Sequence, residues 1–217
     1  MEKRKILMLV TGIAIVIAGI IWYFSKTNIE SVQSDIKKDS VPIGQSFEED
    51  EGVKGQLVYT VDEVRLISDL NKSNIVWENI EKSTMSEYPE CFQDNSLTKG
   101  FTLLVLEISV QNINATNIRS GYENKNVFRA DMVGYVIDIS KYDDNFLYYD
   151  LAYCSLPERA EHSYAYELQP GEETSFQIGY LVPEEKISEQ LMFSSGIGDE
   201  NGIFVSLGLG KQDEERN

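Results

Sequence analysis

The side chains best suited to chemistry in this 217-residue sequence are two cysteines and a single histidine. Cys91 and Cys154 are the simplest candidates for a disulfide, which would stabilise the fold by about 4 kcal/mol in the chain-entropy model. Two unpaired thiols are the alternative. His162 lies between Glu161 and Ser163, but neighbours in the chain do not make a catalytic triad, which requires a defined geometry in space. We therefore expect His162 to be a surface residue, and we expect no catalytic residue.

Carboxylates are so abundant, at 36 Asp and Glu residues, that pairs of them arise by chance. Asp143 and Asp144 could act as the acid and base of a glycoside hydrolase. Together with Asn145 and either Asp138 or Asp150, they could also bind calcium through hard oxygen ligands. The run lacks the spacing of an EF-hand, and an Asp/Asn turn is its ordinary explanation. We therefore expect no metal and no cofactor.

Aromatic residues are dense between positions 142 and 166. Tyrosine rings can stack on sugars or form a protein interface, because they are amphipathic and stiff. They are equally suited to packing within the strands of a sheet, which is the alternative explanation. The candidate binding surface consists of Tyr142, Phe146, Tyr148, Tyr149, Tyr153, Tyr164 and Tyr166.

A long apolar segment follows the basic N-terminal tip, residues 1–5. The run from Ile6 to Phe24 contains 19 residues and no charge. As a helix it would reach about 28 Å, close to the thickness of a hydrocarbon core. No signal-peptidase pattern follows it, because the bulky Tyr23 precedes Ser25 where a small residue is needed. We predict an uncleaved transmembrane anchor at residues 6–24, with the tip in the cytoplasm and the rest outside.

The remainder of the chain divides into three parts. Residues 25–50 are polar and acidic and are predicted to be a linker. Residues 51–211 are predicted to form the folded domain, and residues 212–217 a polar tail. The formal net charge of −17 argues against a nucleic-acid partner, because neutralising phosphates requires a basic surface.

Apolar and polar residues alternate along much of this domain, which indicates half-buried antiparallel strands. In the strongest strand, Leu104 through Val110, every second residue is apolar and should face the core. Phe101 and Leu103 have the opposite parity and are expected nearer the surface, unless a bulge switches the face. The other sets expected to face the core are Leu57, Tyr59 and Val61; Val133, Tyr135, Ile137 and Ile139; Phe176, Ile178, Tyr180 and Val182; and Ile203, Val205, Leu207 and Leu209.

Short strands separated by turn residues predict an all-β, two-sheet sandwich. Four stretches also occur in a characteristic order: Leu57 to Val61, Phe101 to Asn112, Asp131 to Tyr135, and Leu168-Gln169-Pro170-Gly171-Glu172-Glu173 running into Leu181-Val182-Pro183. In that order they resemble the telokin-like, immunoglobulin-like domains of extracytoplasmic proteins of Gram-positive bacteria, a family of unknown function. The resemblance implies an immunoglobulin-like antiparallel β-sandwich behind a membrane anchor, and it transfers no catalytic residue. The chain departs from the family in lacking a lipid-modified cysteine and in its longer stretch at residues 67–99.

These observations predict a membrane-anchored, non-catalytic binding or structural module on the outside of a bacterial cell. Its expected partners are the membrane, through the N-terminal helix, and an unidentified extracytoplasmic protein or wall polymer. One alternative is a secreted, antigen-like protein released by cleavage near Ser25. Another is an envelope carbohydrate hydrolase, which would require two facing carboxylates in a deep cleft.

Overall fold

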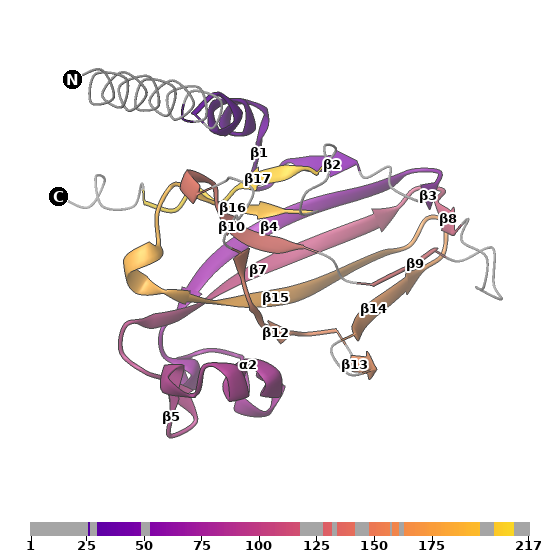
Figure 1. Cartoon of the computed structure of the whole chain (residues 1–217). Helices are drawn as coiled ribbons and strands as arrows, with labels where there is room; N and C mark the ends of the chain where they lie inside the picture. Colours follow the sequence, from indigo (N-terminus) through magenta and orange to yellow (C-terminus); the bar gives the residue numbers. More distant parts are fainter. Residues whose placement is uncertain are drawn as a thin grey trace, which may run out of the picture.

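The chain is an all-β protein in which antiparallel strands form two main sheets (Figure 1). The computed structural model describes residues 26, 30–48, 53–117, 128–131, 134–141, 148–156, 158–160, 163–195 and 202–210. The first sheet has the order β1-β17-β16-β10-β11, with bounds Val41–Pro42, Phe204–Ser206, Leu191–Ser194, Tyr135–Asp138 and Tyr148–Tyr149. The second has the order β12-β15-β7-β4-β2, with bounds Leu151–Cys154, Glu173–Pro183, Phe101–Asn112, Leu57–Ile67 and Ser46–Glu48. The pairing of β1 with β17 is parallel.

Smaller elements complete the described part of the chain. A three-stranded sheet has the order β13-β14-β9, with bounds Glu158–Ala160, Ser163–Leu168 and Phe128–Asp131. Two pairs of short strands are β3 with β8, at Val53–Lys54 and Thr116–Asn117, and β5 with β6, at Phe92–Gln93 and Ser96–Leu97. The short helices are η1 Leu70–Lys72, η2 Trp77–Asn79, α2 Lys82–Glu87, η3 Pro89–Cys91, η4 Ile139–Lys141 and η5 Glu184–Lys186. Residues 30–39 are also helical.

The strand β7 is the centre of the second sheet. It pairs with β15 from Phe101 to Gln111 without a register shift, and with β4 from Leu103 to Asn112 with one irregularity between Val61 and Glu63. The core-facing side chains of β7 are buried, as the alternation predicts, and they pack with core-facing residues of β4 and β15: Leu104, Leu106, Ile108 and Val110, with Leu57, Tyr59, Val61, Phe176, Ile178, Tyr180 and Val182. The core-facing residues predicted for β4, for β15 and for residues 203–209 all lie in this cluster or pack against it, so these predictions are confirmed.

The opposite face of β7 differs from the prediction. Leu103 and Val105 are both fully buried, although no bulge separates Leu103 from Leu104. They are covered by residues 68–100, which we call the cap. The cap occupies one end of the long strands (Figure 1), and its apolar residues form a second cluster with the outer face of the sheet: Leu70, Ile75, Ile80, Cys91 and Leu97 against Leu103, Val105, Tyr153 and Leu181. The prediction that Leu103 lies near the surface is wrong. The alternation of residues within one strand carries no information about another segment that covers it.

The cap is also hydrogen-bonded to the edge strand β12. Ile80 forms an isolated antiparallel bridge with Tyr153. The backbone N–H of Glu81 donates to the Ala152 carbonyl at 2.9 Å, and the Thr84 hydroxyl donates to the Leu151 carbonyl at 2.7 Å. An uncovered edge would present unpaired backbone groups to other chains, so the cap protects this edge of the sheet as well as its outer face.

The side chains of β10 face the opposite way from the prediction. Val136 faces the core, whereas Ile137 and Ile139 lie in a separate cluster with Met192. Ile36, from the helix at residues 30–39, packs against that cluster. Because the outer face of this sheet is also apolar, alternation alone could not identify the side that faces the core. Val133, from the same predicted set, lies outside the described residues.

The boundary between linker and domain comes earlier than predicted. The stretch assigned to a linker at residues 25–50 contains β1, which pairs with β17, and β2, which pairs with β4. Their few apolar residues are used in the core, because Phe47 of β2 is buried there and Val41 of β1 packs against it. The predicted anchor at residues 6–24 lies outside the described residues.

The turn at residues 169–172 has the predicted geometry. Gly171 has a φ of +88°, and the Glu172 N–H donates to the Gln169 carbonyl at 3.0 Å, as in a type II turn. The fully buried Asn112 holds this turn in place: its carbonyl accepts from the Gly171 N–H at 2.7 Å, and its side-chain amide donates to the Leu168 carbonyl at 3.0 Å. Asn112 thus joins the end of β7 to the start of β15.

The two sheets are also joined by a buried hydrogen bond. The hydroxyl of Tyr180, on β15, donates to the Gly134 carbonyl at 2.8 Å, just before β10. Burial raises the pKa of Tyr180 well above its ordinary value, so the hydroxyl stays protonated and able to donate. A side chain at position 134 would meet the Phe193 ring at 2.3 Å, so the close packing at this junction requires glycine.

We predict that Leu103→Ala and Leu104→Ala each lower the free energy of unfolding by about 2–5 kcal/mol, because both side chains are fully enclosed although they face opposite ways. Urea denaturation of the purified protein measures both. Gln111→Ala, at an exposed position of the same strand, is the control and should change stability by less than about 0.5 kcal/mol. A Leu103→Ala protein as stable as the control would mean that the cap does not pack on the sheet.

Candidate functional site

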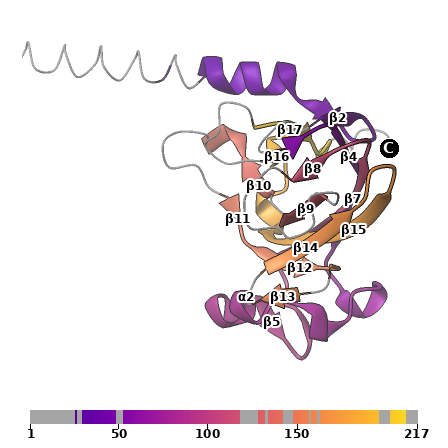
Figure 2. The same ribbon diagram turned by 90° about the vertical axis from the view of Figure 1, so that its right-hand side faces the viewer.

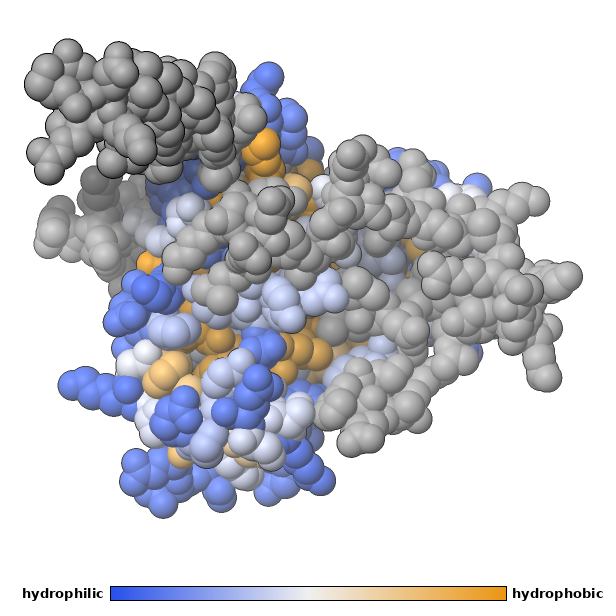
Figure 3. Space-filling model, in the orientation of Figure 1, coloured by the Kyte–Doolittle hydropathy of each residue, from blue (hydrophilic) through white to orange (hydrophobic). Residues whose placement is uncertain are grey.

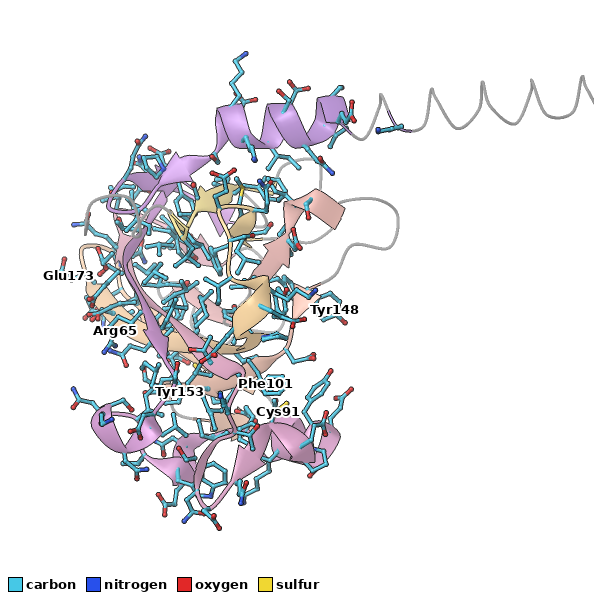
Figure 4. All side chains as sticks on the ribbon, turned by 90° about the vertical axis from the view of Figure 1, so that its left-hand side faces the viewer. Arg65, Cys91, Phe101, Tyr148, Tyr153 and Glu173 are labelled. Carbon is cyan, nitrogen blue, oxygen red and sulfur yellow. The ribbon has the colours of Figure 1, made fainter. Side chains whose placement is uncertain are left out.

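A polar hollow lies on the outer face of the second sheet, beyond the area that the cap covers. Its volume is about 420 Å³. It crosses four neighbouring strands, β2, β4, β7 and β15, and its lining consists of Ser46, Val58, Thr60, Ser109, Val110, Gln111, Glu173, Thr174 and Ser175. The side chain of Glu173 projects from one side of the molecule, together with Arg65, and Tyr148 lies on the opposite side (Figure 4).

Four hydroxyl side chains form a row across the floor of this hollow. The register places Ser46 beside Thr60, Thr60 beside Ser109, and Ser109 beside Ser175. Neighbouring strands are about 4.8 Å apart, so the row is about 14 Å long. We call these four residues the hydroxyl row. Its members come from four different strands, so the hydrogen-bonded sheet itself determines their spacing.

The hydroxyl groups of the row bond partly to neighbouring side chains and keep some capacity to bond to a ligand. The hydroxyls of Ser46 and Thr60 are 2.9 Å apart and share a hydrogen bond, and the Ser109 hydroxyl donates to Asp62 at 2.5 Å. Each hydroxyl has one proton and two lone pairs, so these contacts do not exhaust it. The exposed Ser175, beside Gln111 and Glu173, extends the set of groups that can donate or accept.

Carboxylates flank the hydroxyl row on both sides. On the side toward the cap, Glu63 lies opposite Glu107 in the register, and Asp62 contacts Ser109. On the other side, Glu173 pairs with Gln111 and belongs to the lining itself. The described lining contains no Lys or Arg side chain. Arg65 pairs with Glu63 at 3.6 Å, but the other carboxylates and the chain's formal net charge of −17 favour cationic ligands over anionic ones.

The chemistry available in the hollow is hydrogen bonding and charge attraction. Glu173 is the single carboxylate among the described lining residues, and none of them is a histidine or cysteine. Glycoside hydrolysis normally requires two carboxyl groups facing the scissile bond. The arrangement therefore suits recognition of a polar ligand better than hydrolysis of one.

Four of the seven aromatic residues predicted to form a binding surface are buried. Tyr149, Tyr164 and Tyr166 are buried in the core between the sheets, and Tyr153 is buried beneath the cap. Tyr148 is 49% exposed and makes an edge-to-face contact with Tyr135. These four rings pack within the strands of the sheets, which was the alternative explanation for the aromatic residues. Tyr142 and Phe146 lie outside the described residues.

Buried tyrosine hydroxyls still require partners in the core. The hydroxyls of Tyr59 and Tyr166 are 2.6 Å apart and form a hydrogen bond. The hydroxyl of Tyr149 has no partner within the described part of the chain, and burial, with a contribution from nearby Asp138, raises its pKa to about 12. Tyr149 therefore remains neutral at any physiological pH, which limits the cost of burying it.

The predicted disulfide is wrong, because Cys91 and Cys154 are both free and buried. Cys91 belongs to the cluster beneath the cap, on the outer face of the sheet, and lies near Tyr153 at that end of the molecule (Figure 4). Cys154 follows Tyr153 in β12, and its side chain packs in the core on the inner face. The sheet separates the two thiols, because successive residues of a strand point to opposite faces.

The remaining candidates have structural partners or lie outside the described residues. Asp138 accepts two hydrogen bonds from Ser140, at 3.0 Å and 2.6 Å, and Asp150 accepts one from the Tyr88 hydroxyl at 2.5 Å. No group of three potential ligands in the described part is arranged to hold a metal ion. The described residues do not include His162 or residues 143–145.

The hydroxyl row was not predicted, because serine and threonine in a strand are a weaker functional signal than aromatic and titratable residues. Its signal was present in the polar positions of the predicted strands, where Thr60, Ser109 and Ser175 alternate with core residues. A sheet face that is merely solvated produces the same alternation. The order of the strands is needed to bring these positions into one row.

We predict that both cysteines react slowly with iodoacetamide in the native protein and rapidly after unfolding. Burial raises the pKa of each thiol to about 11, and the thiolate is the reactive form. Raising the pH from 7 to 9 should therefore continue to increase the rate without a plateau, because both pH values lie below this pKa. Mass spectrometry of alkylated peptides measures both sites. If neither cysteine of the unfolded protein is alkylated until dithiothreitol is added, the two are joined in a disulfide and the free-thiol assignment is wrong.

Searches of protein-family models, curated proteins and solved structures find no match for this chain. Among the helices in the described part, none has both the length and the apolar character needed to cross a membrane.

Proposed function

We propose that this chain is a membrane-anchored, extracytoplasmic binding module without catalytic activity, and that the polar hollow is its ligand site. The observation on which this depends is the hydroxyl row, held by four paired strands and open to solvent. Binding sites on rigid strands need little reorganisation when a ligand arrives, which reduces the entropic cost of binding.

The anchoring part of the proposal depends on the apolar run from Ile6 to Phe24 and the basic residues before it. A span of this length suits a bilayer, and the basic tip favours a cytoplasmic N-terminus. The helix at residues 30–39 packs on the domain through Ile36. Only residues 25–29 then separate the anchor from that helix, so the domain would lie close to the membrane surface.

We also propose that the fold is immunoglobulin-like and related to the telokin-like family. Two five-stranded sheets around one core support this proposal. So do the roles of the motif residues, because Asn112 holds the turn at Gly171 and Gly134 permits the junction beside Tyr180. The cap at residues 68–100 is the addition that distinguishes this chain.

The two sides of the molecule differ in the chemistry of their surfaces. The face seen in Figure 1 shows hydrophobic residues at its centre and hydrophilic residues over the cap (Figure 3). The long strands β4, β7 and β15 lie together on the other side (Figure 2). There the surface beyond the cap is polar, with hydrogen-bonding groups at regular intervals.

We predict that Ser175→Arg abolishes most binding of the purified protein to isolated bacterial envelopes, with at least a tenfold loss of affinity. The longer, charged side chain would occupy the hollow from an exposed position. Ser86→Arg, at an exposed position on the cap, adds the same side chain elsewhere and should bind normally. Co-sedimentation measures binding, and a thermal melt confirms that both variants are folded. Equal binding by both variants would show that the hollow is not the site.

We predict that protease added to intact cells digests the domain, because the basic N-terminal tip keeps residues 1–5 in the cytoplasm. Immunoblotting of the C-terminal part measures the loss. Lysed cells are the control for the susceptibility of the domain. Protection in intact cells, followed by digestion after lysis, would contradict the proposed orientation.

A further inference from the structure

Resting on the proposed function, we propose that the ligand of the hollow is an extended polysaccharide of amino sugars with free amines, lying across the strands along the hydroxyl row. The row supplies hydrogen-bonding groups at regular steps over about 14 Å. A sugar polymer presents its own hydroxyls at each ring. The two repeating sets of hydroxyls can therefore hydrogen-bond to each other.

The charge beside the row also complements a polymer that carries amines. Glu173 lies in the lining, and Asp62, Glu63 and Glu107 lie beside the row. An ammonium group placed near such carboxylates forms charge-assisted hydrogen bonds, which are stronger than neutral ones. Polymers rich in phosphate or carboxylate would be repelled by the same groups. Asp62 already accepts from Ser109, and Glu63 pairs with Arg65 at 3.6 Å. A neutral sugar would satisfy the hydroxyl row but offer no positive charge to Glu107 and Glu173.

The absence of a stacking surface determines the mode of binding. The described lining contains no aromatic side chain, so a sugar ring would be held by its edges through hydrogen bonds. Affinity for one ring is then weak, and successive rings along the row must contribute together. Many copies of the protein on one membrane would strengthen attachment to a polymer further.

The test is isothermal titration calorimetry on the full chain in detergent, with the β-1,4-linked glucosamine tetramer as the probe. We expect the tetramer to bind at least about tenfold more tightly than glucosamine itself and than the N-acetylated tetramer. Raising the salt concentration should weaken this binding, because the charged groups are exposed. Equal affinity for the free-amine and N-acetylated tetramers would overturn the role of the carboxylates.

Two pairs of variants separate the hydroxyl row from the charge. Glu173→Gln should weaken binding of the glucosamine tetramer at least fivefold, and Glu78→Gln, which removes the same charge from the exposed surface of the cap, should not. Thr60→Val replaces a hydroxyl of the row by a methyl group and should also weaken binding, whereas Thr98→Val on the cap should not. If Thr60→Val binds normally, the row is not recognised and the inference fails.

Tetralysine distinguishes a polysaccharide from a cationic peptide. We expect it to bind at least tenfold more weakly than the glucosamine tetramer, because it lacks hydroxyls. Equal or tighter binding of tetralysine would overturn the inference in favour of a basic peptide. If envelope binding is lost in Ser175→Arg while no sugar binds the unmodified protein, the proposed function survives and the amino-sugar inference fails.

Discussion

The pairing of β7 with both β4 and β15 is the constraint on which the rest of the structure depends. Because β7 keeps one register with β15 and changes register only once with β4, the core-facing residues of the three strands converge on a single cluster between the two sheets. The same register aligns their outward residues into rows. The inner face therefore gives the protein its stability, and the outer face gives it a surface whose chemistry changes along the strands.

That change in chemistry divides the outer face into two regions. Toward the start of β7, Leu103 and Val105 are apolar and the cap covers them; toward its end, Ser109 and Gln111 are polar and lie open. The cap also shields the edge strand β12 by bonding to its backbone. One segment of the chain thus covers the apolar part of the sheet's outer face and leaves uncovered the polar part that we propose as the ligand site.

The core-facing residues of β4, β15 and β17 were predicted correctly. Leu181 of β15 and Phe204 of β17 nevertheless pack on the outer faces of the sheets. The prediction was wrong for Leu103 and for Ile137, because a second segment covers the outer face at both places: the cap over one, and Ile36 over the other. The disulfide failed for a related reason, since Cys91 and Cys154 lie on opposite faces of one sheet. The hollow could not be predicted, because it exists only once the order of the strands is known.

The most direct test of the divided outer face is an NMR map of backbone amide shifts when solubilised envelope polymer is added to the protein. The account predicts that the affected amides cluster at Thr60, Ser109 and Ser175, while those of Leu103, Val105 and Leu181, beneath the cap, remain unchanged. Shifts confined to Tyr148 and its neighbours, on the opposite side of the molecule (Figure 4), would contradict it. In that case the polar end of the sheet would be a solvated surface and the binding site would lie elsewhere.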